Sequence, residues 1–281
     1  MTNAFWRCIF ALKQIIQIMK TKLFIKILVF SCLYIAVTAE GYSQEELFRA
    51  HAAENMDKLP AMSAFSSSWI GFHIRNDFGM KEMMFADVSC VWHHNKNLLT
   101  STVNHYGYAN YGEMQISVGY GRNFGDRFAM TARIFYLMAH ARGYPSTHSL
   151  CTDFAFAYKA TQKVLMNAVV YNPFMLRYGV VGQNIIPLRF AIGCTYMPMQ
   201  KFLMSLTMTK MLPGEWEVEG RFMTQPTPPL LLSVSCSNSR LGVFFGLIYR
   251  KFLISVEAAW YYRISVSPQI GGHYFPSSYN Q

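Results

Sequence analysis

Charged residues are scarce in this chain. Only 14% of its 281 residues are Asp, Glu, Lys or Arg, whereas an average soluble domain has about 25%. Hydrophobic residues reach 52% and aromatic residues 16%. This composition excludes a disordered chain, which needs low hydrophobicity and high charge. It also argues against an ordinary soluble enzyme.

Long apolar runs are missing after residue 39, which excludes helical membrane spans in that part of the chain. Paired cysteines are missing too, because Cys90, Cys151, Cys194 and Cys236 stand singly, without CxxC or metal-ligand spacing. We expect buried free thiols, with disulfides left open in an oxidising compartment. No cofactor and no metal site is expected.

Residues 1–39 predict a secretory signal peptide. An apolar stretch at 23–37 follows basic residues and ends in a small-residue cleavage pattern formed by Val37 and Ala39. A membrane anchor is the alternative, but the stretch is shorter than the roughly 20 residues that span a bilayer, and Lys26 interrupts it. Met19 is the predicted start of the natural chain.

Half of the positive net charge comes from the predicted signal peptide. Residues 1–39 carry five basic and no acidic side chains, so their removal lowers the net charge from +10 to +5. A nucleic-acid partner needs a clustered basic patch. The rest of the chain has none, and no nucleic acid is expected as a partner.

Apolar and polar residues alternate with period two through the remaining chain. In one such segment Phe252, Ile254 and Val256 share a face, and Ser255 and Glu257 share the other. Fourteen segments show the pattern: 69–75, 81–92, 98–106, 113–122, 128–140, 150–159, 164–171, 188–196, 202–210, 216–223, 230–236, 241–249, 252–262 and 269–275. Their lengths suit tilted membrane strands. We predict an all-β fold, a transmembrane antiparallel β-barrel of about 14 strands over residues 67–275.

The connections indicate a bacterial outer membrane. Tight turns such as 250–251 follow even strands, and the longest connections, 141–149 and 172–187, follow odd ones. Aromatic residues near strand ends predict interfacial girdles: Trp92, Tyr106, Tyr171, Tyr196, Tyr249 and Tyr262. Outer-membrane lipid and the barrel-assembly machinery are the expected partners, together with other outer-membrane or secreted proteins.

The segment before the barrel, residues 40–66, predicts a short helix. Ser43 and Glu46 have capping-box spacing, and apolar residues recur near helical period up to Leu59. This helix either plugs the barrel or forms a loosely attached arm. Residues 276–281 form a tail after the last strand.

Eleven charged residues fall on the mixed face of the strands and are predicted to point into the lumen: Arg75, Asp87, Arg133, Asp153, Lys159, Arg189, Glu217, Glu219, Arg221, Glu257 and Arg263. They form either a lumen-filling network of ion pairs or a polar conduit. Large residues of the same face, such as Phe135 and Phe244, favour the network.

Two further groups are weak candidates for chemistry. His93, His94 and His105 lack a carboxylate at helical spacing, and a solvated turn is favoured over a metal site. His148, Ser149 and Asp153 are near one another in sequence, which is not the spatial geometry that a catalytic triad needs. We expect no enzyme activity.

Several segments resemble the outer-membrane barrels of Bacteroidetes that are related to type IX secretion shuttle proteins, and more distantly the long-chain fatty-acid transporter fold. These segments are Gly119–Arg122 with Phe124–Arg127, Val170–Phe174, Pro187–Phe190 with Gly193 and Tyr196, and Ser267–Gly271. The resemblance covers residues 60–275 and implies a fourteen-stranded barrel with an N-terminal segment near the lumen.

Two functions follow. The favoured hypothesis is a docking or shuttle component of a secretion or surface-attachment complex. The alternative is a transporter or pore for small hydrophobic molecules.

Overall fold

The computed structural model describes residues 44–56, 58–80, 82–178, 184–262 and 265–276. The predicted signal peptide at 1–39 and residues 277–281 of the tail lie outside these residues.

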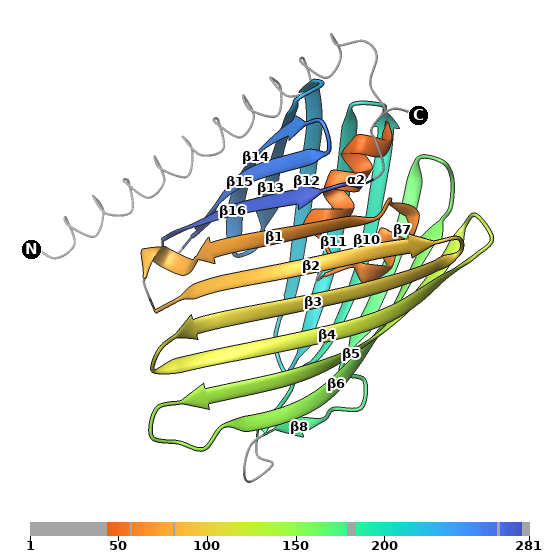
Figure 1. Ribbon diagram of the computed structural model, residues 1–281. Helices are drawn as coiled ribbons and strands as arrows, with labels where there is room; N and C mark the ends of the chain where they lie inside the picture. Colours follow the sequence, from red (N-terminus) through yellow and green to blue (C-terminus); the bar gives the residue numbers. More distant parts are fainter. Residues whose placement is uncertain (1–43, 57, 81, 179–183, 263–264, 277–281) are drawn as a thin grey trace, which may run out of the picture. The chain divides into compact units, whose positions relative to one another are not determined.

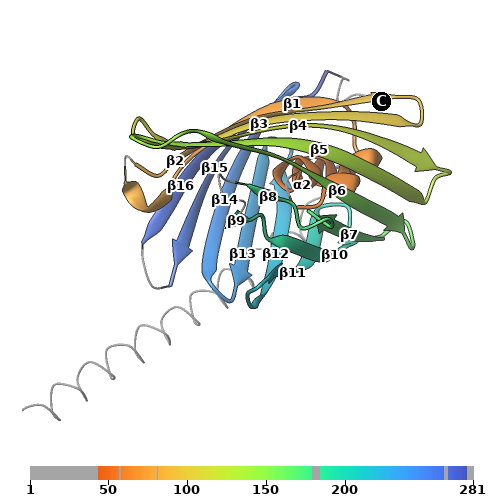
Figure 2. The same ribbon diagram turned by 90° about the horizontal axis from the view of Figure 1, so that it is seen from below.

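Fourteen antiparallel strands form one closed barrel (Figures 1 and 2). They are β1 (Trp69–Asn76), β2 (Met84–His94), β3 (Asn97–Tyr108), β4 (Tyr111–Phe124), β5 (Phe128–Ala141), β6 (Thr147–Lys159), β7 (Val164–Tyr171), β10 (Leu188–Met199), β11 (Phe202–Leu212), β12 (Trp216–Thr227), β13 (Leu230–Ser237), β14 (Arg240–Tyr249), β15 (Phe252–Tyr261) and β16 (Val266–Tyr274). β1 pairs with both β2 and β16, so the ring has no free edge. The predicted fold class and strand number are confirmed.

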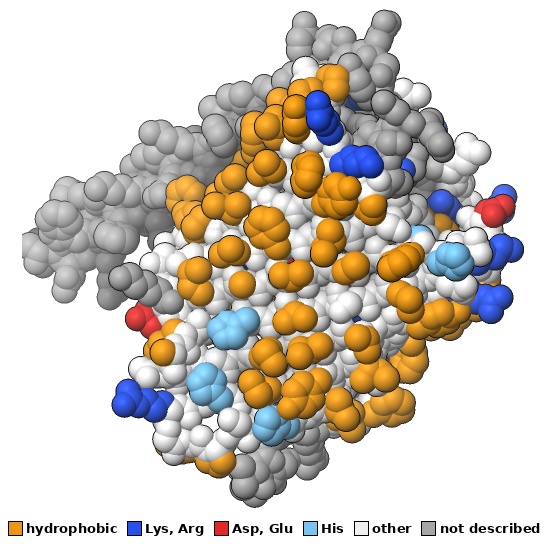
Figure 3. All heavy atoms as spheres, viewed as in Figure 1, with side chains coloured by type: hydrophobic (Ala, Val, Ile, Leu, Met, Phe, Trp, Pro, Cys, Tyr) orange, Lys and Arg blue, Asp and Glu red, His pale blue; other side chains and the backbone are white. Residues whose placement is uncertain are grey.

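Alternation along each strand separates an apolar outer face from an inner face. On β15, Ile254 is 55% exposed whereas Ser255 is 3% exposed, because neighbouring residues point to opposite sides of the wall. Figure 3 shows apolar side chains covering the outer face over β1 to β6, with Lys, Arg, Asp and Glu gathered at its edges. This distribution is typical of a surface in contact with hydrocarbon.

The aromatic girdle forms in part only. Trp92, Tyr196, Tyr249 and Tyr262 are exposed, as predicted. Tyr106 and Tyr171 instead line a cavity inside the barrel. Their distance from the strand end suggested a girdle, but their position in the alternation puts them on the inner face.

The connections define two ends of the barrel. One end, here called the turn end, carries the short turns after β2, β4, β6, β10, β12 and β14. The opposite end, here called the loop end, carries residues 77–83, 142–146 and 172–187, the last of which contains a two-stranded hairpin of β8 (Arg177–Tyr178) and β9 (Asn184–Ile185). The ladder shifts register after Tyr196 and after Thr224, near Pro198 and Pro226, because proline has no N–H to donate.

A helical plug of α2 (Gln44–Glu54) and η1 (Pro60–Phe65) lies inside the ring (Figure 2). No helix among the described residues is long and apolar enough to cross a membrane. The helix α2 is buried around its circumference, as expected for a helix enclosed by protein: Leu47, Phe48, Arg49, Ala50, His51, Ala52 and Ala53 all have little exposure. Small side chains of the surrounding wall leave it room, among them Ala129, Ala155 and Ala157.

Contacts of the plug place it toward the turn end. Asn123, at the end of β4, donates a hydrogen bond of 3.0 Å to the Ala64 carbonyl, and Lys159, at the end of β6, lies 4.3 Å over the Phe65 ring. The backbone N–H of His93 donates to the Ser68 hydroxyl at 2.9 Å. The plug interpretation of residues 40–66 therefore holds for the described part of that segment.

The four described cysteines are free. Cys151 is buried and Cys90 and Cys194 are half-buried, whereas Cys236 is exposed on the outer face, against the expectation of burial. The apolar outer face also suits a thiol, so the strand alternation explains the position of Cys236 without enclosure by protein.

A pair of adjacent substitutions tests the assignment of faces. Val103 is 44% exposed on the outer face, and Asn104 faces an interior cavity. Val103→Arg places a charge in hydrocarbon and is expected to destabilise the barrel by about 2–4 kcal/mol near the midplane. Asn104→Arg serves as the control, since its charge enters an interior cavity that Glu113 and Gln115 also line. Heat-modifiable migration and urea unfolding in lipid vesicles measure both, and equal folded yields would contradict the assignment.

Candidate functional site

Among the described residues, the barrel interior holds two large cavities and, within a layer of charged residues between them, a smaller space of about 140 Å³. Strand alternation brings side chains of all fourteen strands toward the axis, so the chemistry of the inner face decides what the interior accepts. The cavities lie on either side of the charged layer and the plug.

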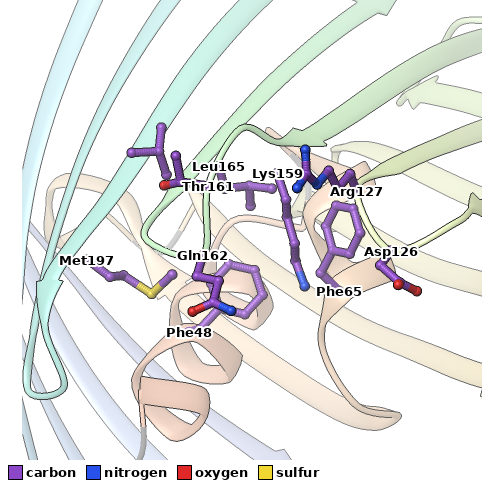
Figure 4. Close-up of a pocket in the computed structure, with 10 residues that line it drawn as sticks. Phe48, Phe65, Asp126, Arg127, Lys159, Thr161, Gln162, Leu165 and Met197 are labelled. Carbon is purple, nitrogen blue, oxygen red and sulfur yellow. The ribbon is translucent and has the colours of Figure 1, made fainter.

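The turn-end cavity has a volume of about 460 Å³ (Figure 4). Phe48 and Phe65 of the plug face Leu165 and Met197 of the wall across it. Charged and polar residues form its rim: Asp126, Arg127, Lys159, Thr161 and Gln162. An apolar floor with a largely cationic rim suits an amphiphilic molecule with an anionic or polar head.

The loop-end cavity consists of two adjoining spaces of about 430 Å³ and 220 Å³. Both are lined by Phe85, Asn104, Gln115, Tyr171, Pro187 and Met211. The larger space adds apolar side chains such as Leu137, and the smaller one adds Arg133 and Arg189 at its inner side. The cavity is thus mainly apolar, with a few polar groups able to orient a bound molecule.

The connection between β7 and β10 folds back over this cavity. Ile186 packs against Phe135 and Cys151 of the wall. Asn172 holds the connection in place: its side-chain N–H groups donate to the Ile186 carbonyl at 2.7 Å and the Leu176 carbonyl at 3.4 Å, and its oxygen accepts from the Leu176 N–H at 3.0 Å. Asn172 has a φ of 52°, a conformation that asparagine tolerates better than most residues.

The charged layer begins with a buried ion pair. Arg133 on β5 and Asp153 on β6 are direct cross-strand partners, and Arg133 Nε donates to Asp153 Oδ2 at 3.0 Å. Arg133 also donates to the Met56 carbonyl of the plug at 3.4 Å. The pair therefore joins the wall to the plug.

A second cluster of charges lies across the lumen around Glu219 of β12. Lys58, which follows α2, contacts Glu219 Oε2 at 2.6 Å, and Arg240 of β14 contacts the same oxygen at 2.9 Å. Arg221 lies 3.4 Å from the other oxygen. Glu54 and Glu257 line the same space as Arg221 and Arg240, so further carboxylates balance the three cations around Glu219.

A third contact links the plug to β1 and β15. Glu54 of α2 accepts from the Ser255 hydroxyl at 3.3 Å, and its carboxylate lies 3.6 Å from Nε2 of His73. Burial alone raises the pKa of Glu54, but the contact with His73 outweighs burial and holds the pKa at about 2. Glu54 is therefore a carboxylate at neutral pH.

His51 is an uncharged buried polar group on α2. Burial, assisted by the charge of Arg221, lowers the pKa of His51 to about 3, so the imidazole is neutral at ordinary pH. The Asn55 side chain donates to Nδ1 of His51 at 3.2 Å and to its carbonyl at 2.8 Å. The helix thus carries a polar stripe without adding charge there.

Ten of the eleven charged residues singled out in the sequence lie on the inner face, and Arg263 lies outside the described residues. Arg133, Asp153, Glu219 and Arg221 belong to the ion pairs above, and Asp87 Oδ1 accepts from His73 Nδ1 at 3.0 Å. The remaining five have other neighbours. Arg75 forms an ion pair with Asp77, and Glu217 accepts a hydrogen bond from Ser239. Lys159 and Arg189 lie over the rings of Phe65 and Tyr171, and Glu257 lines a space of about 140 Å³ together with Arg221. Each of these five side chains thus has a local contact or lines a space, and the choice between a lumen-filling network and a polar conduit stays a prediction.

The structure does not assemble the two weaker candidate groups. The His93 side chain points inward whereas His105 is exposed on the outer face. His148 points outward to the Tyr136 hydroxyl at 2.7 Å, and Asp153 points inward to Arg133. Neither the three histidines nor the Ser149 group forms a common site.

Sequence reasoning missed the residues that join the plug to the wall. Lys58, Arg240 and His273 were not singled out, and Glu54 and His51 were part of an unspecified helix. The polar residues His51 and Glu54, placed among apolar neighbours on α2, were one available signal. The position of His73 on the same inner face as Asp87 was another. Their partners depend on strand register and plug depth, which the alternation leaves undetermined.

Several solved structures have a similar fold, and hydrocarbon transporters are among them. The toluene transporter TbuX of Ralstonia pickettii has a TM-score of 0.58 at 8% identity, covering 84% of this chain and 95% of that chain. The Pseudomonas putida toluene transporter TodX has a TM-score of 0.55 at 8% identity, covering 84% and 97%. A Pseudomonas aeruginosa FadL homologue has a TM-score of 0.53 at 7% identity, covering 84% and 99%. No protein-family model and no curated protein matches the chain.

At this identity the likeness shows a shared fold. The fatty-acid-transporter part of the predicted resemblance is thereby confirmed at the level of the barrel. The similar structures carry no information on a relationship to Bacteroidetes or to type IX secretion, which stays a prediction.

Removal of one partner of the buried pair tests the charged layer. Asp153→Asn leaves Arg133 buried without its counter-charge, and we expect a loss of about 3–5 kcal/mol in the free energy of unfolding. The double variant Arg133→Met with Asp153→Leu removes both charges and is expected to lose much less. Urea titration in vesicles compares the two variants, and an equal loss in both would contradict the pairing.

Proposed function

We propose that this chain is a bacterial outer-membrane transporter for small hydrophobic or amphiphilic molecules. The observation that carries the proposal is the pair of largely apolar cavities at the two ends of one closed barrel, with a docked plug between them. A non-transporting scaffold has no need for cavities of this kind at both ends of its lumen.

The apolar walls of the two cavities supply the binding energy. Each bound CH₂ group contributes about 0.8 kcal/mol when it leaves water, and the side chains of Phe48, Phe65, Leu137 and Tyr171 offer such contact. Asn104 and Gln115 at the loop end can orient a polar substituent. A molecule then enters at the loop end and leaves at the turn end.

The plug keeps the path closed to water and ions. Glu54, Met56 and Lys58 are bound to β15, β5 and β12 respectively. Passage of a molecule requires these contacts to break or the plug to shift within the ring. The charged layer thus acts as the gate of the proposed pathway.

The similar folds support transport over docking. TbuX and TodX are toluene transporters by their names. The docking hypothesis, and with it the predicted relationship to type IX shuttle barrels, gains no support from those structures. An outer-membrane location, with lipid and the barrel-assembly machinery as partners, is part of our proposal and is supported by the apolar outer face.

Filling the loop-end cavity tests the pathway. Leu137 lines this cavity, whereas Leu150 on the next strand is 58% exposed on the outer face. Leu137→Trp is expected to slow the entry of a small aromatic hydrocarbon into liposomes by several-fold, since the ring occupies the cavity. Leu150→Trp is the matched control and is expected to transport normally. Equal rates in both variants would count against the cavity as part of the path.

Deletion of the plug separates transport from docking. The full chain in a planar bilayer is expected to carry no steady ion current. A variant lacking residues 44–65 is expected to conduct steadily, because the plug no longer occupies the lumen beside the charged residues. A deletion variant that folds but stays silent would contradict the gate. A silent full chain that passes no hydrocarbon and co-purifies with other membrane proteins would support docking instead.

A further inference from the structure

Three metal-ligating side chains converge where the plug meets the seam of the barrel. Glu54 comes from α2, His73 from β1 and His273 from β16, the last strand. One ligand atom of each lies within 4.8 Å of the others. The histidine residues are 7% and 2% exposed, and the Glu54 side chain is 3% exposed.

His273 is a buried imidazole whose two ring nitrogens have no hydrogen-bond partner among the described residues. Its surroundings are aromatic: Trp69 meets the ring edge-on with centroids 5.3 Å apart, and the His73 ring lies 4.8 Å away. An unpartnered polar group in such a place is costly and calls for a ligand. Nε2 of His73 also makes no hydrogen bond, because its 3.6 Å separation from the Glu54 carboxylate is an ion-pair distance that exceeds a hydrogen bond.

The wall is shaped to hold these two rings. His273 stands directly across from Gly71 and His73 directly across from Gly271 in the β1–β16 ladder. A Cβ on Gly71 would lie 2.3 Å from the His273 ring, and a Cβ on Gly271 would lie 2.4 Å from the His73 ring. Each imidazole therefore occupies space that is open only because the residue opposite it is glycine.

Asp87 completes the arrangement from the second strand. Its carboxylate lies 3.0 Å from Nδ1 of His73 and is its cross-strand partner in the β1–β2 ladder. A carboxylate that accepts a hydrogen bond from one ring nitrogen orients the other toward a metal ion, a common outer-shell arrangement in metal sites. This leaves Nε2 of His73 directed at Glu54.

We propose that Glu54, His73 and His273 bind a zinc ion that fastens the plug to the barrel seam. Two imidazoles and a carboxylate are a familiar zinc ligand set, with a fourth position left for water or another ligand. Zn–N and Zn–O bonds of about 2.0–2.2 Å in a tetrahedron place donor atoms about 3.3 Å apart, so the present donors need to approach by at most about 1.5 Å. A space of about 140 Å³ beside Glu54, His73 and Asp87 has room for the fourth ligand.

Bound zinc would join three segments that are far apart in sequence: the plug, the first strand and the last strand. Proton binding is the competing account, in which a charged His73 bridges Asp87 and Glu54. That account leaves both nitrogens of His273 without a partner. The two accounts therefore differ in whether His273 is needed.

Zinc titration of the full chain, folded in detergent and stripped with a chelator, tests the proposal. We expect saturable uptake of one Zn²⁺ per chain, and Co²⁺ in its place should give the intense visible absorption of a tetrahedral site. His273→Gln and Glu54→Gln should each weaken Zn²⁺ binding by more than the roughly 10- to 100-fold typical of losing an outer-shell partner. Glu54→Gln is included because it lies in the plug and leaves the wall unchanged.

His105→Gln is the control, since His105 is an exposed histidine of the outer face. It should bind Zn²⁺ as the unmodified chain does, and heat-modifiable migration should verify that every variant is folded. The proposal is overturned if the folded chain takes up no stoichiometric zinc, or if His273→Gln and Glu54→Gln retain full affinity. Zinc binding lost in His105→Gln alone would also overturn it.

Discussion

The need to pair every backbone N–H and C=O within the protein governs this structure. Hydrocarbon offers no hydrogen-bond partners, so a sheet that crosses it must close upon itself. The pairing of β1 with β16 meets this need. Closure at fourteen strands then creates an interior too wide for the strand side chains alone to fill, and the plug, the charged layer and the inward-folded connection at Asn172 occupy it.

The two faces of each strand follow different rules as a result. The outer face needs only to be apolar, and residues such as Ile254 and Val103 meet that need without specific partners. The inner face needs defined partners, because a buried charge is tolerated only when paired. Arg133 with Asp153, and Lys58 and Arg240 with Glu219, show how the lumen keeps its charges satisfied beside an apolar plug.

Sequence periodicity is sufficient to predict the strands of the barrel. It is insufficient to predict the side-chain contacts and the plug in its interior. Period-two alternation predicted all fourteen strands and placed His73 and Arg75 opposite Ile74, because side-chain direction along a strand is a local property. It did not predict that Asp153 meets Arg133, or that His273 lies over Gly71, because those contacts depend on register between strands. The depth of α2 was equally undetermined, since its small and apolar residues suit either a plug or an arm. Tyr106 and Tyr171 were assigned to the girdle by their distance from a strand end, although the alternation placed them inside.

The seam between the first and last strands has a consequence for how the molecule assembles. Side chains on both of its borders approach Glu54 of the same short helix: His73 of β1 lies 3.6 Å from its carboxylate, and His273 of β16 has a ring nitrogen within 4.8 Å of it. Contacts of one helix with both borders favour closure of the sheet around that helix. Enclosure of the helix and closure of the barrel are thereby linked, because the same carboxylate lies beside the first strand and the last.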